Sequence, residues 1–268
     1  MPTSPSIFDR IWAALLFFTR LPLWRLHQPS KEAYATVVEH WPLTGWLTGG
    51  VTAAGLYLFS LWLPWPLAIV LAIALRMLLT GALHEDGLAD FFDGFGGGGG
   101  DRQRILSIMK DSHIGTYGVL GLVVYLLTIV FTLLPMVPSQ AVWVVLLADP
   151  FAKLLAANMI VLPYARSEET AKSKVVYRRL SGQATASLLV QGLLPLVFCL
   201  WQLGAFSANG PLAWWEILLV VAVPMLVSKG LFCYVRRRLG GYTGDCCGAV
   251  FLLTEASVLL TMLVCLVN

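Results

Sequence analysis

Three aspartates in the segment HEDGLADFFDG are the residues of this sequence best suited to chemistry. Asp86, Asp90 and Asp93 are separated by four and then three residues. On a helix, these spacings place the carboxylates within about 40–60° of one another around the axis, so they share a face. An all-oxygen cluster suits a hard divalent cation such as Mg²⁺, which commonly accompanies a phosphate-bearing substrate. The pattern therefore predicts a Mg²⁺ site at these aspartates.

Two further polar segments combine an aspartate with small and hydroxyl residues. They are KDSHIGTYG (110–118) and GGYTGD (240–245), and each precedes an apolar stretch. Small residues let the backbone approach a ligand closely, and a helix amino terminus that follows attracts phosphate. Either segment alone is compatible with an ordinary turn at a membrane surface. Together with the aspartates, they indicate one site built from three parts of the chain.

The elements that must position these segments are membrane helices. Hydrophobic residues make up 58% of the 268 residues, charged residues make up 12%, and the mean hydropathy is +0.77. A chain in lipid must satisfy its own backbone hydrogen bonds, which favours helices of about 20 apolar residues. We therefore expect an all-α bundle that forms one integral membrane domain (1–268). Seven spans are predicted, near 43–63, 65–83, 115–135, 141–162, 184–204, 213–234 and 248–267.

The distribution of basic residues predicts the orientation of the spans. Lys and Arg occur before the first span, between the second and third, and around the ends of the fourth and sixth. The three turns on the other side contain none. By the positive-inside rule, the amino terminus and the three polar segments face the cytoplasm. The first 25 residues have too short an apolar core for a signal peptide and predict a short helix at the membrane interface.

Charged residues within the apolar stretches leave a functional and a structural interpretation open. Asp149 and Lys153 are four residues apart and would form an ion pair on a helix. Charges at membrane depth are costly and often functional, but a structural pair is nearly as well supported. Arg76 and Glu255 raise the same question, and Arg76 is expected either to snorkel or to pair with the aspartates.

Glycines and cysteines add no predicted chemistry. The run Gly96–Gly100 is not followed by GK[ST], so it is not a P-loop. It predicts a flexible connector, with a lid over a nucleotide as the alternative. The five cysteines lie mostly in apolar runs without disulfide or metal-binding spacing, and we expect small buried hydrophobic residues there.

Together, these motifs resemble one family, the cobalamin synthases, also called adenosylcobinamide-GDP ribazoletransferases. The likeness begins with FFTRLP, continues through HEDGLADFFDG and IMKDSHIGTYG, and ends with GGYTGDCCGA and LTEA. The motifs follow in the family's order over about residues 15–256. The resemblance implies a polytopic helical protein of the bacterial inner membrane, which agrees with the predicted spans.

The resemblance also implies a Mg²⁺-dependent phosphoryl transfer. The ribose 3′-hydroxyl of α-ribazole, or of its 5′-phosphate, attacks the cobinamide-linked phosphoryl of adenosylcobinamide-GDP. GMP departs, and adenosylcobalamin or its 5′-phosphate forms. Such chemistry needs charge neutralisation and alignment more than covalent catalysis. The expected partners are these substrates and the lipid bilayer, without nucleic acid. A homo-oligomer and contacts with other enzymes of cobalamin assembly stay open.

Residue roles follow from the motifs and the resemblance together. The expected Mg²⁺ ligands are Asp86, Asp90 and Asp93, joined by Asp111. The favoured general base is Asp111, because a metal-activated alcohol needs only a modest base. Glu85 points about 100° away from Asp86 on an ideal helix and is not included. Asp93 and Lys110 are the other expected catalytic residues, and substrate contacts are expected at Arg20, Ser112, His113, Thr243 and Asp245.

Two other functions share parts of the pattern. Asp90 to Gly94 gives DxxDG, which opens the signature of the CDP-alcohol phosphotransferases that synthesise phospholipids, but the remainder of that signature is absent. An ion-coupled transporter would bind its ion at carboxylates near the bilayer midplane. Here the acidic residues cluster near one membrane face, and no internal repeat is visible.

Overall fold

The computed structural model describes residues 5–165, 176–205 and 212–267, and confirms the all-α prediction. Within these ranges the regular elements are helices, without a β-strand. The α-helices are α1 (Ile7–Phe18), α2 (Lys31–Tyr34), α3 (Trp41–Ser60), α4 (Trp65–Thr80), α5 (Leu83–Gly97), α6 (Arg102–Lys110), α7 (Thr116–Leu133), α8 (Pro138–Ala156), α9 (Gly182–Gln202), α10 (Trp214–Leu239) and α11 (Gly244–Val267). Short 3₁₀ helices are η1 (Leu23–Arg25), η2 (Val37–His40) and η3 (Ala157–Val161).

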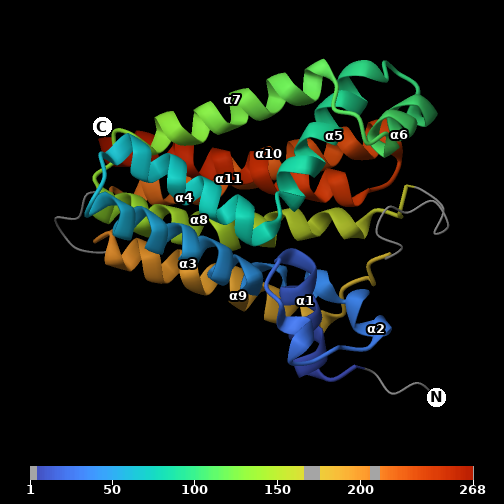
Figure 1. The fold of residues 1–268 in the computed structure, drawn as a ribbon, viewed down its shortest axis with the longest axis horizontal. Helices are drawn as coiled ribbons and strands as arrows, with labels where there is room; N and C mark the ends of the chain where they lie inside the picture. Colours follow the sequence, from blue (N-terminus) through green and yellow to red (C-terminus); the bar gives the residue numbers. More distant parts are fainter. Residues whose placement is uncertain (1–4, 166–175, 206–211, 268) are drawn as a thin grey trace.

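The long helices run side by side along the long axis of the molecule, with α1, α2, α5 and α6 gathered toward one end (Figure 1). By length and composition, α7, α8 with η3, α9, α10 and α11 can each cross a membrane, and these match the last five predicted spans. Helices α4 and α5 count as a sixth only if their bent pair is one span. Helix α3 is 20 residues long but is not among these candidates.

Helix α8 lies at the centre of the bundle, where it contacts α3, α9 and α11. Small residues set its distance to α3: a Cβ added at Gly45 would lie 2.7 Å from the Cα of Pro150. Such close backbone approach is what drives helix association in lipid, where hydrophobic burial between helices contributes little. Thr48 of α3 adds a hydrogen bond to Asp149 across this contact.

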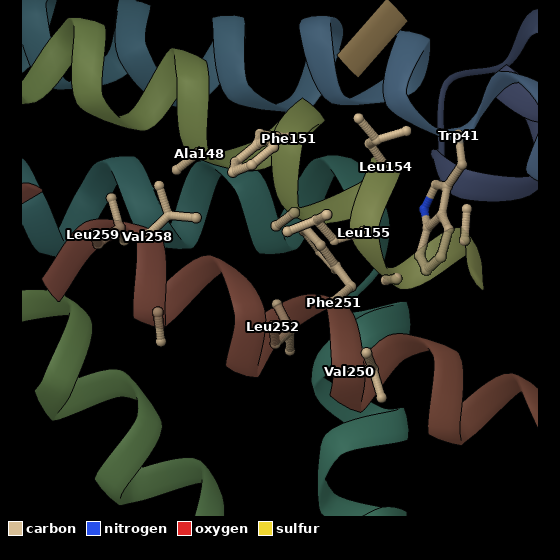
Figure 2. Close-up of a cluster of buried hydrophobic side chains, with 14 of the residues drawn as sticks. Trp41, Ala148, Phe151, Leu154, Leu155, Val250, Phe251, Leu252, Val258 and Leu259 are labelled. Carbon is tan, nitrogen blue, oxygen red and sulfur yellow. The ribbon is translucent and has the colours of Figure 1, made fainter. Parts of the chain in front are cut away.

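The core between α8 and α11 is built from large apolar side chains. Figure 2 shows Phe151 and Leu155 of α8 and Phe251 of α11 in this region, with Trp41 beside them. Phe151 and Phe251 are each 1% exposed. This packing holds α11 against the centre of the bundle, so the first turn of α11 has a fixed position.

A sharp bend separates α4 from α5. Gly81 has φ +66° and Ala82 has φ +54°, and the N–H of Ala82 donates to the carbonyl of Met77 at 2.8 Å. This is the left-handed ending expected of a helix that stops. The axes of α4 and α5 therefore differ by 92°. The predicted second span ends here, and the aspartate segment lies on a helix of its own that turns across the end of the bundle.

Candidate active site

Helix α5 carries all three aspartates of the HEDGLADFFDG segment, as predicted, but their surroundings differ. Asp86 is exposed, Asp90 is partly buried, and Asp93 is buried with 8% exposure. The change along the helix follows from α6 and α7, which pack against its second half. Only the first half of this face is open to solvent.

The buried carboxylate of Asp93 caps the amino terminus of α7. Its oxygens accept hydrogen bonds from the N–H groups of Gly115 and Gly118, at 2.7 and 2.8 Å. A Cβ on either glycine would collide with this carboxylate, so glycine is required at both positions. An anion at a helix amino terminus is stabilising. Asp93 thus anchors the KDSHIGTYG segment to α5, while its predicted role toward Mg²⁺ stays a prediction.

The loop between α6 and α7 presents its polar side chains to solvent. Oδ1 of Asp111 accepts from the N–H of His113 at 3.0 Å and lies 2.7 Å from its Nδ1. The hydrogen bond with the His113 ring, followed by that with its backbone, lowers the pKa of Asp111 below the usual value. Asp111 is therefore ionised at neutral pH. Lys110 and Ser112 beside it are exposed.

A cavity of about 140 Å³ opens between α1, η2, α5 and the first turn of α11. Asp86 of α5 and Asp245 of α11 both border it. Its other lining residues are mostly aromatic or apolar, so the two carboxylates stand at the edge of an apolar space. These residues are Phe17, Phe18, Val38, Trp41, Leu83, His84, Tyr164, Tyr177, Gly244, Cys247 and Gly248.

Glycines bring the two carboxylates together although they lie far apart in the sequence. A Cβ on Gly87 would lie 3.1 Å from the Cα of Asp245, and one on Gly248 would lie 3.4 Å from the Cα of His84. Helices α5 and α11 therefore approach closely at this point. As a result, the structure joins two of the three segments that the sequence assigned to one site.

The GGYTGD segment is held by its own backbone and side chains. Thr243 is fully buried, and its Oγ1 accepts from the N–H of Cys246 at 3.2 Å, which caps α11. Tyr242 forms a parallel bridge with Tyr164, in which its N–H donates to the carbonyl of Pro163 at 2.9 Å. Thr243 positions Asp245 in this arrangement. The predicted contact of Thr243 with substrate stays a prediction.

Arg20 lies beside the bend that starts α5. Its backbone N–H donates to the carbonyl of Leu79 at 2.7 Å, and its exposed side chain lies across Gly81, where a Cβ would collide with it. The guanidinium therefore stands near the first turn of α5. This location is compatible with the predicted contact to an anionic group.

The predicted site residues form two groups rather than one. Asp86 and Asp245 border the cavity, Thr243 is buried next to it at the start of α11, and Arg20 lies at the nearby bend. Asp93 lies two turns further along α5, about 10 Å along the helix axis, and the Asp111 loop is attached there. Within the described ranges, no three His, Cys, Asp or Glu side chains are grouped closely enough to hold a metal ion by themselves.

A separate charged network lies inside the bundle. Arg76 of α4 contacts Glu255 of α11 at 2.5 Å, Tyr125 of α7 at 3.0 Å and Glu85 of α5 at 3.7 Å. The hydroxyl of Tyr125 also donates to Glu255 at 3.1 Å. The expectation that Arg76 snorkels or pairs with the aspartates is therefore wrong, because buried glutamates on two neighbouring helices neutralise it. This network ties four helices together.

Asp149 and Lys153 form the predicted ion pair, with 2.5 Å between Oδ1 and Nζ. Thr48 of α3 donates to Asp149 at 2.6 Å and accepts from Lys153 at 2.7 Å. Nζ of Lys153 also lies 4.7 Å from the centre of the Phe251 ring. Both residues are fully buried, and each charge contacts its counter-charge and the hydroxyl of Thr48. These contacts support the structural interpretation of the pair.

The glycine run after the aspartates is only partly a connector. Gly96 and Gly97 end α5, the Tyr117 ring lies over Gly96, and Ile105 of α6 lies over Gly98. Gly99 has φ +57° and its carbonyl accepts from Arg238. The prediction of a flexible connector is wrong for Gly96–Gly98, because Gly96 and Gly97 belong to α5 and a Cβ on Gly96 or Gly98 would collide with a neighbouring side chain. The cysteine prediction is confirmed for four of the five cysteines, which are buried, and Cys233 is partly buried.

The aromatic lining of the cavity was not predicted. Phe17 and Phe18 lie in the FFTRLP motif, which was noted for Arg20 alone. Tyr164 and Tyr177 belong to the segment YARSEETAKSKVVYRRL (164–180), whose many charged residues are typical of a solvated connector. Residues 166–175 of that segment lie outside the described residues, but its two ends line the cavity. The tyrosines in an otherwise charged stretch were the available signal.

Comparisons with known proteins identify the family of the chain. A family model described as cobalamin-5-phosphate synthase matches residues 10–263. A relative from Leptospira interrogans named adenosylcobinamide-GDP ribazoletransferase is 33% identical over 249 residues, covering 91% of this chain and 90% of the relative. Proteins with the same name from Vibrio parahaemolyticus and Leptothrix cholodnii are each 36% identical, covering 93% and 92% of this chain and 90% and 92% of their own length. No solved structure matches the chain.

Proposed function

The chain belongs to the cobalamin-5-phosphate synthase family, and on this premise we propose that it joins α-ribazole, or its 5′-phosphate, to adenosylcobinamide-GDP. The ribose 3′-oxygen forms a bond to the phosphorus that carries cobinamide, and the bond from that phosphorus to GMP breaks. The hydroxyl proton passes to a carboxylate, and GMP leaves. The product is adenosylcobalamin or its 5′-phosphate. The observation that carries this proposal is the pair Asp86 and Asp245 at the edge of one aromatic cavity.

The open half of α5 suits Mg²⁺ in the presence of a phosphate substrate. Mg²⁺ is usually held by one or two carboxylates together with phosphate oxygens and water. Asp86 is exposed and Asp90 lies one turn further along the same helix, so these two residues would hold the ion. Asp93 and Asp111 already accept hydrogen bonds and would contribute less. When bound, Mg²⁺ neutralises the diphosphate and stabilises departing GMP.

Exposed cations frame this face for an anionic donor. Arg20 stands near the first turn of α5, and Lys110 stands in the loop that Asp93 anchors, beyond the third aspartate. A nucleotide donor extended along α5 would thus have Arg20 at one end and Lys110 at the other. Each cation acts by orienting the donor, because phosphoryl transfer depends mainly on alignment and charge neutralisation.

Two carboxylates compete for the role of general base. Asp111, which the sequence favours, is ionised but stands at the far end of the α5 face. Asp245 borders the cavity next to Asp86. The variants Asp111→Asn and Asp245→Asn distinguish the two. The variant that removes the general base should lower kcat by about 10²–10⁴-fold and leave the KM for the donor unchanged. The other variant should not show this combination.

We assign the protein to the bacterial inner membrane, with the amino terminus and the active site on the cytoplasmic side. The apolar helices and the family relationship support a multi-pass membrane protein. The distribution of Lys and Arg supports the orientation. Cysteine-accessibility labelling of Ser112→Cys in inside-out and right-side-out vesicles would test it, and labelling only from the cytoplasmic side is expected.

The test of the function is product formation by purified protein in lipid nanodiscs. Adenosylcobinamide-GDP, α-ribazole and Mg²⁺ should yield adenosylcobalamin and GMP in equal amounts. CDP-diacylglycerol with an alcohol acceptor should yield no CMP. CMP release would instead indicate a CDP-alcohol phosphotransferase, and ion flux into proteoliposomes without nucleotide would indicate a transporter.

A further inference from the structure

The cavity beside Asp86 and Asp245 is lined by flat rings that lie nearly parallel. Phe18 stacks on Trp41, with ring centres 5.4 Å apart and 12° between the planes. The His84 ring lies at 12° to Phe18 and 20° to Trp41, with centres 6.0 Å apart in both pairs. The three ring centres form a triangle, so the rings make one wall whose planes share nearly one orientation, and a flat ligand parallel to them can pack against it. The aromatic lining therefore favours a planar ring.

A second aromatic group lines the cavity from other parts of the chain. Tyr177 stacks on Tyr242 at 5.9 Å and 12°, and lies at 85° to Phe17. The Tyr242 hydroxyl accepts from the N–H of Tyr177 at 3.1 Å. The Tyr164 ring lies 5.3 Å from Tyr242. These contacts hold the second wall in place by packing and by a hydrogen bond.

Few polar groups are available inside the cavity. Trp41 is 2% exposed and His84 is 4% exposed, and both line it. Within the described residues, Nε1 of Trp41 and Nε2 of His84 are both buried without a hydrogen-bond partner, so neither nitrogen is presented to the cavity. A ring with few hydrogen-bonding groups suits such an apolar wall. Guanine would bring several donors and acceptors into an apolar space, where each one left unpaired is costly.

The size and the position of the cavity further limit which part of the substrates can bind in it. A cavity needs about 10–15 Å³ to hold one water molecule. A cavity of about 140 Å³ therefore admits a small heterocycle. A corrin macrocycle is far larger. The two carboxylates border the cavity, so a ribose attached to a base inside would emerge beside Asp86 and Asp245. Carboxylates accept hydrogen bonds from ribose hydroxyls.

From these observations we propose that the cavity binds the planar base of the acceptor nucleoside, with its ribose directed toward Asp86 and Asp245. The ligand class is a benzimidazole-like base with few hydrogen-bonding groups. The proposal rests on the proposed function for the identity of the acceptor. It assigns the acceptor to the α1, α5 and α11 end of the site and leaves the remaining face of α5, toward the Asp111 loop, to the nucleotide donor.

The test is calorimetric binding of α-ribazole and of GMP, measured separately on purified protein with Mg²⁺ and without donor. Trp41→Phe replaces the indole in the cavity wall with a smaller ring, and it should weaken α-ribazole binding by about 10-fold while changing GMP binding by less than about 2-fold. Phe17→Leu, which alters a half-buried wall, should act in the same direction. Trp62→Phe is the matched control, because Trp62 is 85% exposed outside the cavity.

Each outcome decides the proposal. Weaker binding of α-ribazole alone, in either folded cavity variant, supports it. Weaker binding of GMP alone would assign the cavity to the guanine base, and equal or absent changes in both ligands would also overturn the proposal. Wild-type protein that binds α-ribazole in this pattern but forms no product would leave the binding site standing and refute the proposed reaction instead. Gel filtration and Tm establish that each variant is folded.

Discussion

Two neighbouring carboxylates on α5 show how one helix serves two regions of the molecule. Asp86 is exposed at the edge of the cavity, whereas Glu85 is 4% exposed and lies 3.7 Å from Arg76. Successive residues on a helix differ by about 100° in direction, so the two side chains face opposite surroundings. The carboxylate with a buried counter-charge stabilises the bundle. The one without such a counter-charge is available to a cation or a substrate.

The same difference separates the interior network from the cavity region as a whole. In the interior, Arg76, Glu255 and Tyr125 satisfy one another, and Asp149 with Lys153 does the same beside α3. At the cavity, carboxylates border an apolar space that is open to a ligand. Charge inside a membrane protein is therefore not by itself a sign of chemistry. What matters is whether the protein already neutralises it.

Removal of Mg²⁺ should have the largest effect, and it should act on the cavity region but not on the interior network. Chelation of Mg²⁺ should lower GMP release by about 10³-fold or more, because the metal supplies several kcal/mol of charge stabilisation. The Tm should stay unchanged, since the interior network holds the bundle together without metal. Activity should return on adding Mg²⁺ but not Na⁺. A large fall in Tm on chelation would show that the metal is structural, and would contradict the distinction between a stabilising interior network and a chemical cavity region.

Breaking the interior network should affect stability first. Arg76→Leu leaves Glu255 and Glu85 buried without their cation, which should destabilise the protein by about 3–5 kcal/mol. The double variant Arg76→Leu/Glu255→Leu should recover part of this loss. Unfolding in mixed micelles measures both. A stable Arg76→Leu protein that has lost its activity would place Arg76 in the chemistry and contradict the comparison.

Asp93 lies outside both regions, on the same helix as Asp86 and Glu85, and should show an intermediate effect. Asp93→Asn keeps one acceptor but turns an amide N–H₂ toward the N–H of Gly115 or Gly118, at a cost of about 1–3 kcal/mol. The KDSHIGTYG loop should then lose protection in hydrogen exchange, and kcat should fall less than for Asp86→Asn. Unchanged exchange in this loop would show that the cap is not what holds it.

The smallest expected effect is a pH dependence of stability from His40. Burial, and then the charge of Arg10, lowers the pKa of His40 from 6.5 to about 4. The unfolded chain therefore binds a proton more readily than the folded protein between these values, and stability is lost as pH falls from about 6.5 toward 4. In His40→Gln the Tm should fall less over this range. His113→Gln is the control, since the His113 side chain is 89% exposed. A Tm that falls more steeply with decreasing pH in His40→Gln than in wild type would show that His40 is not the source of the pH dependence.

The sequence supported the helical class, the pairing of Asp149 with Lys153 and the helix that carries three aspartates, because each depends on local spacing. It did not reveal the bend at Gly81 and Ala82, since no proline marks it and left-handed backbone is not visible in an apolar run. Nor did it separate Asp86 from Asp93, which differ only in what α7 places against them. Tertiary contacts decide which carboxylate is neutralised, and spacing along one helix does not contain them.

The most direct test of the central claim compares the two neighbouring carboxylates in one assay. GMP release in single turnover, normalised to folded protein, is measured for wild type, Asp86→Asn and Glu85→Gln with adenosylcobinamide-GDP, α-ribazole and Mg²⁺. We predict that Asp86→Asn loses about 10³-fold in rate with an unchanged Tm, whereas Glu85→Gln keeps most of its rate and loses stability. Full activity in Asp86→Asn, or loss of activity in a fully stable Glu85→Gln, would contradict the assignment of chemistry to the exposed face of α5.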